Sequence, residues 1–381
     1  MTPKNRSWLL THLSLRQTAS PNLGTGGSNQ LNGVVAVSAN DVWAVGSGTG
    51  DKTLIEHWDG VSWSVVASPN PTTYINRLLS VAAVSANDIW AVGYYVPLSG
   101  GSRTVIEHWN GTAWSIVYNP NLGVSEILRS VAVVSANDVW AVGGYINNWG
   151  DPYNPLIEHW NGTSWSIIPG PNVSVNNPFY GVAVVSANDI WAVGGIILEH
   201  WNGTTWSIVP SPNLTGAAYS IASVSNNDVW AVGEPSSLVE HWDGTSWSIA
   251  SSPNPGPGQN ALYGVAAVSS SDIWAVGLYQ PNGGTAQTLI ARYTDLCFLD
   301  LPVQYSNFSV AANGNYGGNN PGRVNSWFDH NPAGQTVTIW TGDPYTGAAQ
   351  TNVNTCAEST AKTRGQNSSK LTPPQNGQTL I

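Results

Sequence analysis

Five Glu-His pairs recur along the chain, and their residue types suggest metal chemistry: Glu56-His57, Glu107-His108, Glu158-His159, Glu199-His200 and Glu240-His241. Carboxylate and imidazole are both zinc ligands, but a metal needs its ligands within a few ångströms of one point. Equivalent positions of a repeat stand at different places in a fold, so we expect no metal site and no cofactor. Each His should instead hydrogen-bond to an Asp of the preceding strand, as His57 to Asp41. In the last copy Arg292 replaces the His and should bond to Asp272.

A second set of candidate residues lies in the segments that differ between the copies of the repeat. Arginine binds carboxylates and stacks on aromatic rings, and exposed aromatic rings offer stacking faces to sugars and peptides. We expect a glycan or protein partner to bind the following residues: Tyr74, Arg77, Tyr95, Arg103, Arg129, Tyr145, Trp149, Tyr153, Tyr180, Tyr219 and Tyr263. The alternative is a set of ordinary solvated loop residues that happen to be aromatic.

A sequence repeat that occurs six times in the chain must hold these residues in position. Its core is "SANDVWAVG", and the Trp residues of the six copies lie 39 to 51 residues apart at Trp43, Trp90, Trp140, Trp191, Trp230 and Trp274. A period of about 40–50 residues with several short strands is typical of a β-propeller blade. Sixteen of the 20 Trp residues occupy three repeat positions, so we expect them to pack blade against blade rather than to bind ligands.

Each unit predicts four antiparallel strands. In the first copy they are "GVVAV", "VWAVG", "LIEHW" and "WSVVAS", and their near-continuous apolar character fits blades covered on both faces. The link "SAND" is tight, and "DG" or "NG" between the last two strands is a strong hairpin signal. We therefore predict an all-β, six-bladed propeller of four-stranded blades.

The sixth copy has no fourth strand of its own. The segment "LRQTASPN", Leu15–Asn22, aligns with "WSVVASPN", Trp63–Asn70, and should supply that strand and close the ring. The short connection that follows favours closure within one chain over exchange between chains. We predict an N-terminal extension at 1–14, a propeller at 15–294 with the closing strand at 15–22, and an Asn-, Gly- and Thr-rich C-terminal segment at 295–381, either poorly ordered or a small irregular β module.

The pattern "SANDVWAVG…LIEHWNGTSWSIVPSPN" resembles the Trp-rich bacterial propeller repeats that are grouped with kelch and galactose-oxidase-like propellers, and also the tectonin repeats of lectin propellers. The resemblance covers Leu15–Thr294 and implies the fold, while propellers host many activities. A galactose-oxidase-like copper site needs a cysteine and non-repeated histidines, and the blades offer neither. Arg77, Arg103 and Arg129 are compatible with a sialidase, but the sialidase box is missing. We therefore expect no enzyme activity.

Variation between the copies falls on one face of the ring. The links between the second and third strands range from 2 to 12 residues, whereas the "SAND" and "DG" links at the other end keep their lengths. Variable loops on a rigid scaffold commonly carry binding sites. On this face the residue before each innermost strand should line the channel mouth: Asn32, Leu79, Arg129, Tyr180, Tyr219 and Tyr263.

The amino-acid composition limits the kinds of molecule that the chain is expected to bind. A net charge of −10, with only 12 Lys and Arg, argues against nucleic acid and anionic membranes. No apolar run reaches the ~20 residues of a membrane helix, and the first residues make a poor signal peptide. We expect a non-enzymatic binding scaffold at the bacterial surface or outside the cell; the alternatives are a self-assembling structural protein and a sialidase-like glycan-acting enzyme. Cys297 and Cys356 are either a disulfide or two free thiols.

Overall fold

The computed structural model describes residues 20–24, 27–98, 100–171, 176–212, 216–252, 254–282 and 284–294, together with four short strands beyond them. The chain divides into two compact units, Met1–Tyr293 and Thr294–Ile381. The described part of the chain contains no helix long and apolar enough to cross a membrane.

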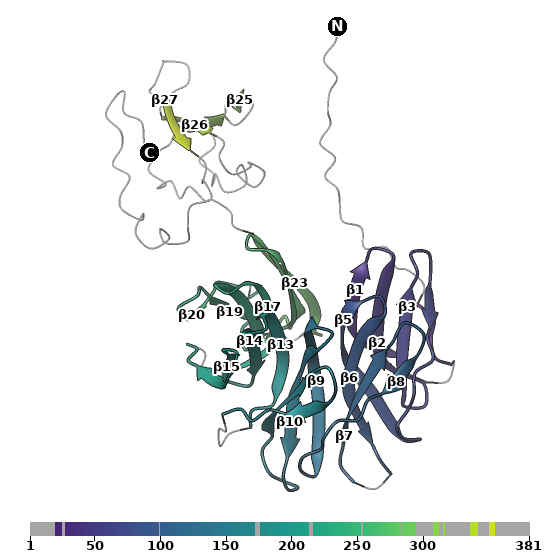
Figure 1. Cartoon of the computed structure of the whole chain (residues 1–381). Coiled ribbons are helices and arrows are strands. Elements are labelled where there is room, and N and C mark those ends of the chain that lie inside the picture. The colour runs from purple at the N-terminus through teal and green to yellow at the C-terminus, as the bar shows by residue number, and fades with distance from the viewer. Residues whose placement is uncertain are drawn as a thin grey trace. The chain divides into compact units, whose positions relative to one another are not determined.

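The first unit consists of successive antiparallel sheets in which each strand pairs with the next along the chain (Figure 1). Blade 1 contains β1 (Gln30–Ser38), β2 (Asp41–Gly48), β3 (Lys52–Trp58) and β4 (Trp63–Val65). Blade 2 contains β5 (Ile75–Ser85), β6 (Asp88–Val96), β7 (Arg103–Trp109) and β8 (Trp114–Ile116). Blade 3 contains β9 (Ser125–Ser135), β10 (Asp138–Ile146), β11 (Asn154–Trp160) and β12 (Trp165–Ile167).

The remaining blades follow the same plan. Blade 4 contains β13 (Phe179–Ser186), β14 (Asp189–Gly194), β15 (Leu198–Trp201) and β16 (Trp206–Val209). Blade 5 contains β17 (Ala217–Ser225), β18 (Asp228–Glu234), β19 (Leu238–Trp242) and β20 (Trp247–Ile249). Blade 6 contains β21 (Asn260–Ser269), β22 (Asp272–Tyr279) and β23 (Gln287–Thr294). The predicted all-β propeller with six blades is confirmed.

Blade 6 has three strands within the described residues, whereas the other blades have four. The closing strand that the sequence predicts at 15–22 lies outside the described residues up to Ala19, and Ser20–Asn22 are not in a strand. The fourth strand of this blade therefore stays a prediction.

The second-strand Trp of each of blades 1 to 5 packs into the following blade. The ring centroid of Trp43 lies 4.9 Å from that of Trp109 and 5.7 Å from that of Trp114. The same arrangement joins blades 2 and 3, 3 and 4, and 4 and 5. In blades 1–5 this Trp is only 1–3% exposed. An aromatic side chain buries about 150–250 Å², so the repeated Trp residues supply much of the packing between blades, as the sequence predicts.

The two constant links lie together at one end of the blades. The indole N–H of Trp109 donates to the carbonyl oxygen of Ala86 in "SAND" at 3.2 Å. The Gly of each "DG" or "NG" turn in blades 1–5 has a φ of 89–93°, a conformation that favours glycine. The opposite end, which carries the variable second-to-third links and the links between blades, is called the long-loop face below.

A β-bulge interrupts the innermost strand of every blade, opposite the Gly of "VWAVG". In blade 2, Leu78 pairs with Gly93 and Ser80 with Val92, so that Leu79 is left over. In all six blades a Cβ on that Gly would lie 1.8–2.3 Å from a carbonyl oxygen of the innermost strand or, in blade 4, of Pro178 directly before it. The bulged strand thus presses on its neighbour at a distance that only glycine permits, and this explains the last residue of the repeated motif.

The second unit contributes one described sheet in the order β25-β24-β26-β27. Its strands are β24 (Phe308–Ala311), β25 (Asn315–Tyr316), β26 (Thr336–Thr341) and β27 (Gln350–Asn354). Cys297 and Cys356 lie outside the described residues, so their pairing stays open.

Candidate functional site

The Asp-His pairs of the repeat are hydrogen-bonded within their own blades. His57 Nε2 lies 2.9 Å from Asp41 Oδ1, and the other four His–Asp pairs are separated by 2.8–2.9 Å. In blade 6, Arg292 donates to both oxygens of Asp272 at 2.7 and 3.0 Å. The structure therefore confirms the pairing expected from the sequence. Across the described ranges, no cluster of three or more His, Cys, Asp or Glu is placed to hold a metal.

The Glu of each "EHW" is buried and faces the segment that leads in from the preceding blade. Ser68 Oγ of blade 1 donates to Glu107 Oε2 of blade 2 at 2.7 Å. Asn119 Nδ2 of blade 2 donates to both oxygens of Glu158 at 3.1 Å. Burial raises the pKa of each of these two carboxyls to about 8, and the hydrogen bonds lower it in part. These bonds tie neighbouring blades together, and the sequence analysis did not identify them, although "SPN" recurs at the right distance.

Glu199 in blade 4 lacks such a donor among the described residues. Gly170 replaces the Ser of "SPN" there, and both carboxyl oxygens of Glu199 are buried without a hydrogen bond. Burial raises its pKa to about 8. The carboxyl is therefore mostly protonated at neutral pH, as expected for an acid without a compensating partner.

The bulges of the innermost strands leave one residue in each blade outside the pairing register. We call this set the bulge row: Asn32, Leu79, Arg129, Tyr180, Tyr219 and Tyr263. A bulge leaves its extra residue outside the ladder and re-aims the side chain, which is why bulges are frequent next to functional sites. These six residues are the ones that the sequence analysis placed at the channel mouth, but they lie within the strands rather than before them.

Four members of the bulge row form a continuous cluster across blades 3 to 6. The Arg129 guanidinium carbon lies 5.0 Å from the ring centroid of Tyr180. The Tyr180 and Tyr219 centroids are 5.2 Å apart, and those of Tyr219 and Tyr263 are 5.4 Å apart. The rings of Tyr180 and Tyr219 meet edge to face, one of the preferred arrangements of aromatic pairs. Tyr263 is 46% exposed, so the cluster presents an aromatic surface to solvent.

Polar groups orient this cluster. The Tyr219 hydroxyl donates to Glu234 Oε1 at 2.5 Å, and Gln259 Nε2 donates to Glu234 Oε2 at 3.2 Å. Burial and the nearby Glu234 carboxylate raise the pKa of Tyr219, so its hydroxyl stays protonated. Arg129 Nε is buried without a hydrogen-bond partner among the described residues, which leaves one donor of the guanidinium unsatisfied.

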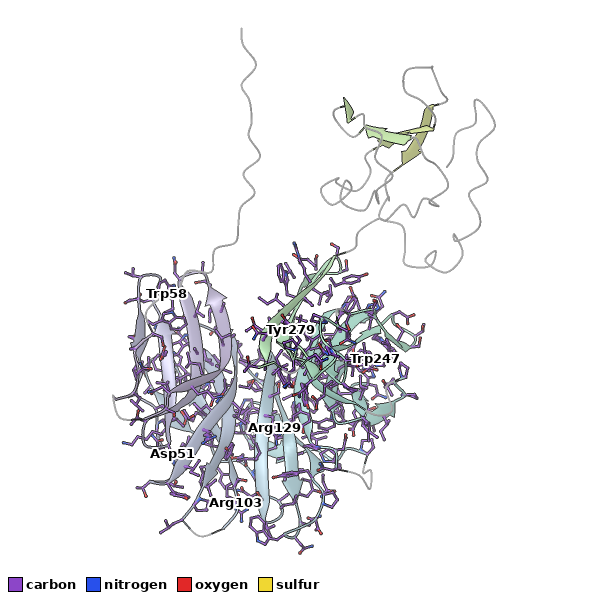
Figure 2. The ribbon with its side chains drawn as sticks, turned by 180° about the vertical axis from the view of Figure 1, so that it is seen from behind. Asp51, Trp58, Arg103, Arg129, Trp247 and Tyr279 are labelled. Carbon is purple, nitrogen blue, oxygen red and sulfur yellow. The ribbon has the colours of Figure 1, made fainter. Side chains whose placement is uncertain are left out.

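The other predicted arginines lie elsewhere on the long-loop face, in ion pairs of their own. Arg77 Nη2 lies 3.7 Å from Asp51, and Arg103 Nη1 lies 3.8 Å from Glu126, whose side chain is fully buried. Burial raises the pKa of Glu126 to about 7. Figure 2 shows Asp51 and Arg103 at this end of their blades, and Trp58 at the opposite end. The three arginines therefore have three different partners rather than one shared site.

The aromatic residues of the predicted set also lie in more than one place. Tyr95 pairs with Arg103, and Tyr145 with Glu126, in the backbone register of their sheets. Tyr74 and Trp149 are 49% and 67% exposed. Tyr153 receives a backbone hydrogen bond from Asn177 on its carbonyl oxygen. These five residues surround the loops of blades 2 and 3, separate from the tyrosines of the bulge row.

No protein-family profile and no curated protein matches this chain. Among solved structures it is similar to YCF48 bound to D1 peptide, at 16% identity over 72% of this chain and 88% of that one, with a TM-score of 0.47. The lectin of Aleuria aurantia in complex with Fucα1-6GlcNAc matches at 12% identity over 68% and 90%, with a TM-score of 0.45. A Dyadobacter fermentans protein of unknown function matches at 11% identity over 69% and 93%, with a TM-score of 0.47. Likenesses at these identities and TM-scores carry no argument about function, and the kelch or tectonin subtype of the chain stays a prediction.

Proposed function

We propose that the protein is a non-enzymatic glycan-binding propeller, and that the bulge row from Arg129 to Tyr263 holds the glycan. The observation that carries this proposal is the continuous cluster of Arg129, Tyr180, Tyr219 and Tyr263 on the innermost strands of blades 3 to 6. A sugar offers an apolar C–H face to an aromatic ring and hydroxyls to polar groups. The cluster offers both, because its rings lie beside the Tyr219–Glu234–Gln259 hydrogen bonds.

The arrangement of the acidic and basic groups supports binding rather than catalysis. Among the described residues, the Asp–His pairs look most like parts of a catalytic set, and they lie toward the "SAND" end of the blades. The bulge row lies on the innermost strands, nearer the opposite end of the same blades. A nucleophile, a base and an orienting group within hydrogen-bond reach of one substrate atom are needed for acyl or glycosyl transfer. Among the described residues, the carboxylate that is hydrogen-bonded to the bulge row is Glu234, and it already accepts from both Tyr219 and Gln259.

A glycan array with the full chain, followed by titration calorimetry, tests the proposal. Tyr180→Ala should weaken binding of the best glycan about tenfold, since a lost ring contact costs about 1–1.5 kcal/mol. Tyr118→Ala is the matched control, because Tyr118 is 83% exposed and lies beyond the outer strand of blade 2. Equal loss of affinity in both variants, or no glycan bound at all, would refute the assignment.

A protein partner is the second candidate, and the exposed Tyr74 and Trp149 on the loops of blades 1 to 3 favour it. Aromatic anchors of this kind are enriched at protein interfaces. Trp149→Ala should then abolish capture of a defined partner while leaving glycan binding by the bulge row intact. A bacterial cell-surface location belongs to the same proposal, and fractionation of cells that produce the full chain tests it.

A further inference from the structure

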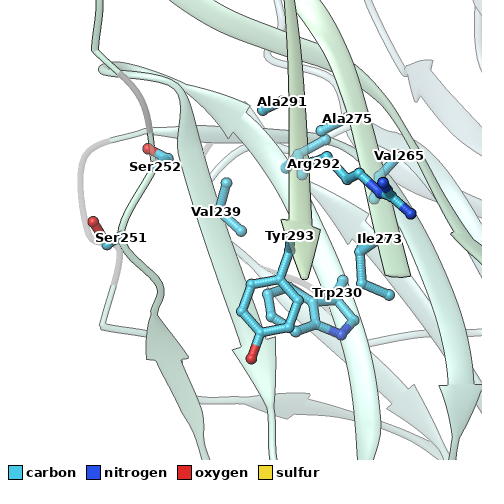
Figure 3. A pocket seen from close by; sticks show the side chains of 11 residues that line it. Trp230, Val239, Ser251, Ser252, Val265, Ile273, Ala275, Ala291, Arg292 and Tyr293 are labelled. Carbon is cyan, nitrogen blue, oxygen red and sulfur yellow. The ribbon is translucent and has the colours of Figure 1, made fainter. Parts of the chain in front are cut away.

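Three of the four arginines in the described part of the chain have a carboxylate partner. Two of them, Arg77 and Arg103, form the ion pairs given above. The third, Arg292, lines the pocket shown in Figure 3 and donates to both oxygens of Asp272 in its own blade. Arg129 is the fourth, and the described residues give its guanidinium neither an ion pair nor a hydrogen bond. A half-buried charge without a counter-charge is costly, so Arg129 is suited to an anionic partner from outside the chain.

The neighbours of Arg129 hold its side chain in place without neutralising it. The guanidinium carbon lies 5.0 Å from the ring centroid of Tyr180, and the face of an aromatic ring attracts a cation. Leu128 and Ser130 on its own strand and Leu79 at the same bulge of blade 2 are uncharged. An arginine side chain does not lose its proton in proteins. The positive charge at this place is therefore permanent.

The terminal nitrogens of Arg129 are the donors that a ligand can reach. Its Nε is buried and unpaired, whereas neither Nη is among the buried unpaired atoms. The two Nη groups therefore keep N–H donors in contact with solvent. A carboxylate fits them in charge and in shape, because its two oxygens accept a pair of parallel hydrogen bonds from a guanidinium. A neutral hydroxyl would leave the charge uncompensated.

The other end of the same cluster carries a negative charge. Glu234 accepts hydrogen bonds from the Tyr219 hydroxyl at 2.5 Å and from Gln259 Nε2 at 3.2 Å. Tyr263, whose ring lies 5.4 Å from that of Tyr219, is 46% exposed. A second carboxylate on a ligand would be repelled by Glu234 here, whereas a neutral sugar can stack on the exposed ring. The cluster thus favours an anion at Arg129 and a neutral group at Tyr263.

We propose that the bulge row selects an oligosaccharide with a carboxylate on its terminal unit, as in a sialic or uronic acid, and with neutral units after it. The terminal carboxylate accepts hydrogen bonds from the Nη groups of Arg129, and the neutral units follow the tyrosines toward Tyr263. This inference rests on the proposed glycan site and adds the chemical class of the glycan and its direction. The net charge of −10 disfavours anions at long range, so the selection depends on direct contact with Arg129.

Titration calorimetry of the full chain with sialyllactose, glucuronyl-lactose and lactose tests the proposal. At least one of the two acidic trisaccharides should bind at least tenfold more tightly than lactose, and the tighter of the two identifies the source of the carboxylate. The methyl ester of that trisaccharide should bind like lactose, because esterification removes the charge and keeps the sugar. Trigalacturonate has a carboxylate on every unit and should bind more weakly than the preferred trisaccharide, because its other units approach Glu234.

Variants of the chain assign the preference to Arg129. Arg129→Gln removes the charge and keeps a polar side chain, so it should bind the acidic trisaccharide and lactose with the same affinity. Arg129→Lys should retain part of the preference, and Glu234→Gln should bind trigalacturonate more tightly than the natural chain does. Lys52→Gln is the matched control, since Lys52 is an exposed cation at the same end of blade 1, and it should keep the full preference. Thermal melts show whether each variant is folded, and the ester comparison needs no variant.

The possible failures separate this inference from the glycan site itself. If lactose binds as tightly as both acidic trisaccharides, or if an array shows only neutral glycans bound, the acid preference is wrong and the glycan site stands. A preference that persists in Arg129→Gln, or that the methyl ester shares, would overturn the role of Arg129. Trigalacturonate that binds as tightly as the preferred trisaccharide would overturn the direction. If no glycan binds at all, the glycan site is refuted and this inference with it.

Discussion

Replacing Gly170 by Ser should stabilise the propeller by restoring a hydrogen bond that four other blades make. Blades 1, 2, 3 and 5 each bury a Glu that accepts a hydrogen bond from a Ser or Asn of the incoming segment. At Glu199 that donor is missing among the described residues, and both oxygens are buried. Leaving a buried polar group unpaired costs about 1–3 kcal/mol. Ser is the residue that supplies the donor from this position in blade 1.

The space at Gly170 decides how much of this gain is retained. A Cβ there would lie 2.9 Å from Glu199 Oε2 and 3.1 Å from Ile157 Cδ1. Both atoms are at the ends of side chains, and the carboxyl needs to move by only a few tenths of an ångström. The φ of Gly170 is outside the left-handed region, so Ser fits the backbone. After this adjustment we expect a net gain in the free energy of unfolding of about 1–2 kcal/mol.

Urea denaturation of the full chain at pH 6 and pH 9 measures the effect. Gly170→Ala is the control, because it adds the Cβ without the hydroxyl and should be neutral or destabilising. A hydroxyl donor favours the charged carboxylate, so Gly170→Ser should gain more over Gly170→Ala at pH 9 than at pH 6. If the Ser and Ala variants unfold at the same urea concentration at both values of pH, the missing hydrogen bond is not a source of instability.

Two further predictions concern the buried carboxyls and the bulges. The pKa of Glu107, Glu158 and Glu199 is raised from 4.5 to about 8 in the folded state. The stabilisation that comes from this raised pKa is fully present below about pH 4.5 and is lost as the pH rises through 8. The free energy of unfolding should fall over that window by up to ~1.4 kcal/mol per pH unit per group. Glu158→Gln should flatten this slope, and an unchanged slope in denaturation curves at pH 5, 7 and 9 would contradict the assignment. Gly143→Ala should destabilise the chain by about 3 kcal/mol, because its Cβ would lie 1.9 Å from the carbonyl oxygen of Ile127. Gly264→Ala should destabilise the chain by less than about 1 kcal/mol, because its Cβ would have only Val276 Cγ2 nearby, at 3.3 Å. Thermal melts compare the two, and equal melting temperatures would mean that the bulge does not require glycine.

The sequence by itself determined the blades of this protein. The period of the repeated Trp, the alternation of strands and turns, and the "DG" hairpins depend on local conformation and on residues close in the chain, and the structure has six blades as predicted. The Asp–His pairs could also be predicted from the sequence, because adjacent antiparallel strands bring residues such as Asp41 and His57 together wherever the register is known. The recurrence of the Glu-His pair in five blades also argued against a shared metal centre, since equivalent residues stand at different places in the fold.

The tertiary structure decided which polar side chains meet between blades, because those contacts join residues about 30 or more positions apart and depend on how neighbouring blades pack. It showed that the extra residues of four bulges, Arg129, Tyr180, Tyr219 and Tyr263, contact one another across neighbouring blades. It separated Arg77 and Arg103 from that cluster by giving each its own carboxylate. It also showed that Val34 of blade 1 and Val276 of blade 6 are 68% and 49% exposed in the described chain, which no comparison of repeats reveals, because the equivalent residues of blades 2 to 5 are buried.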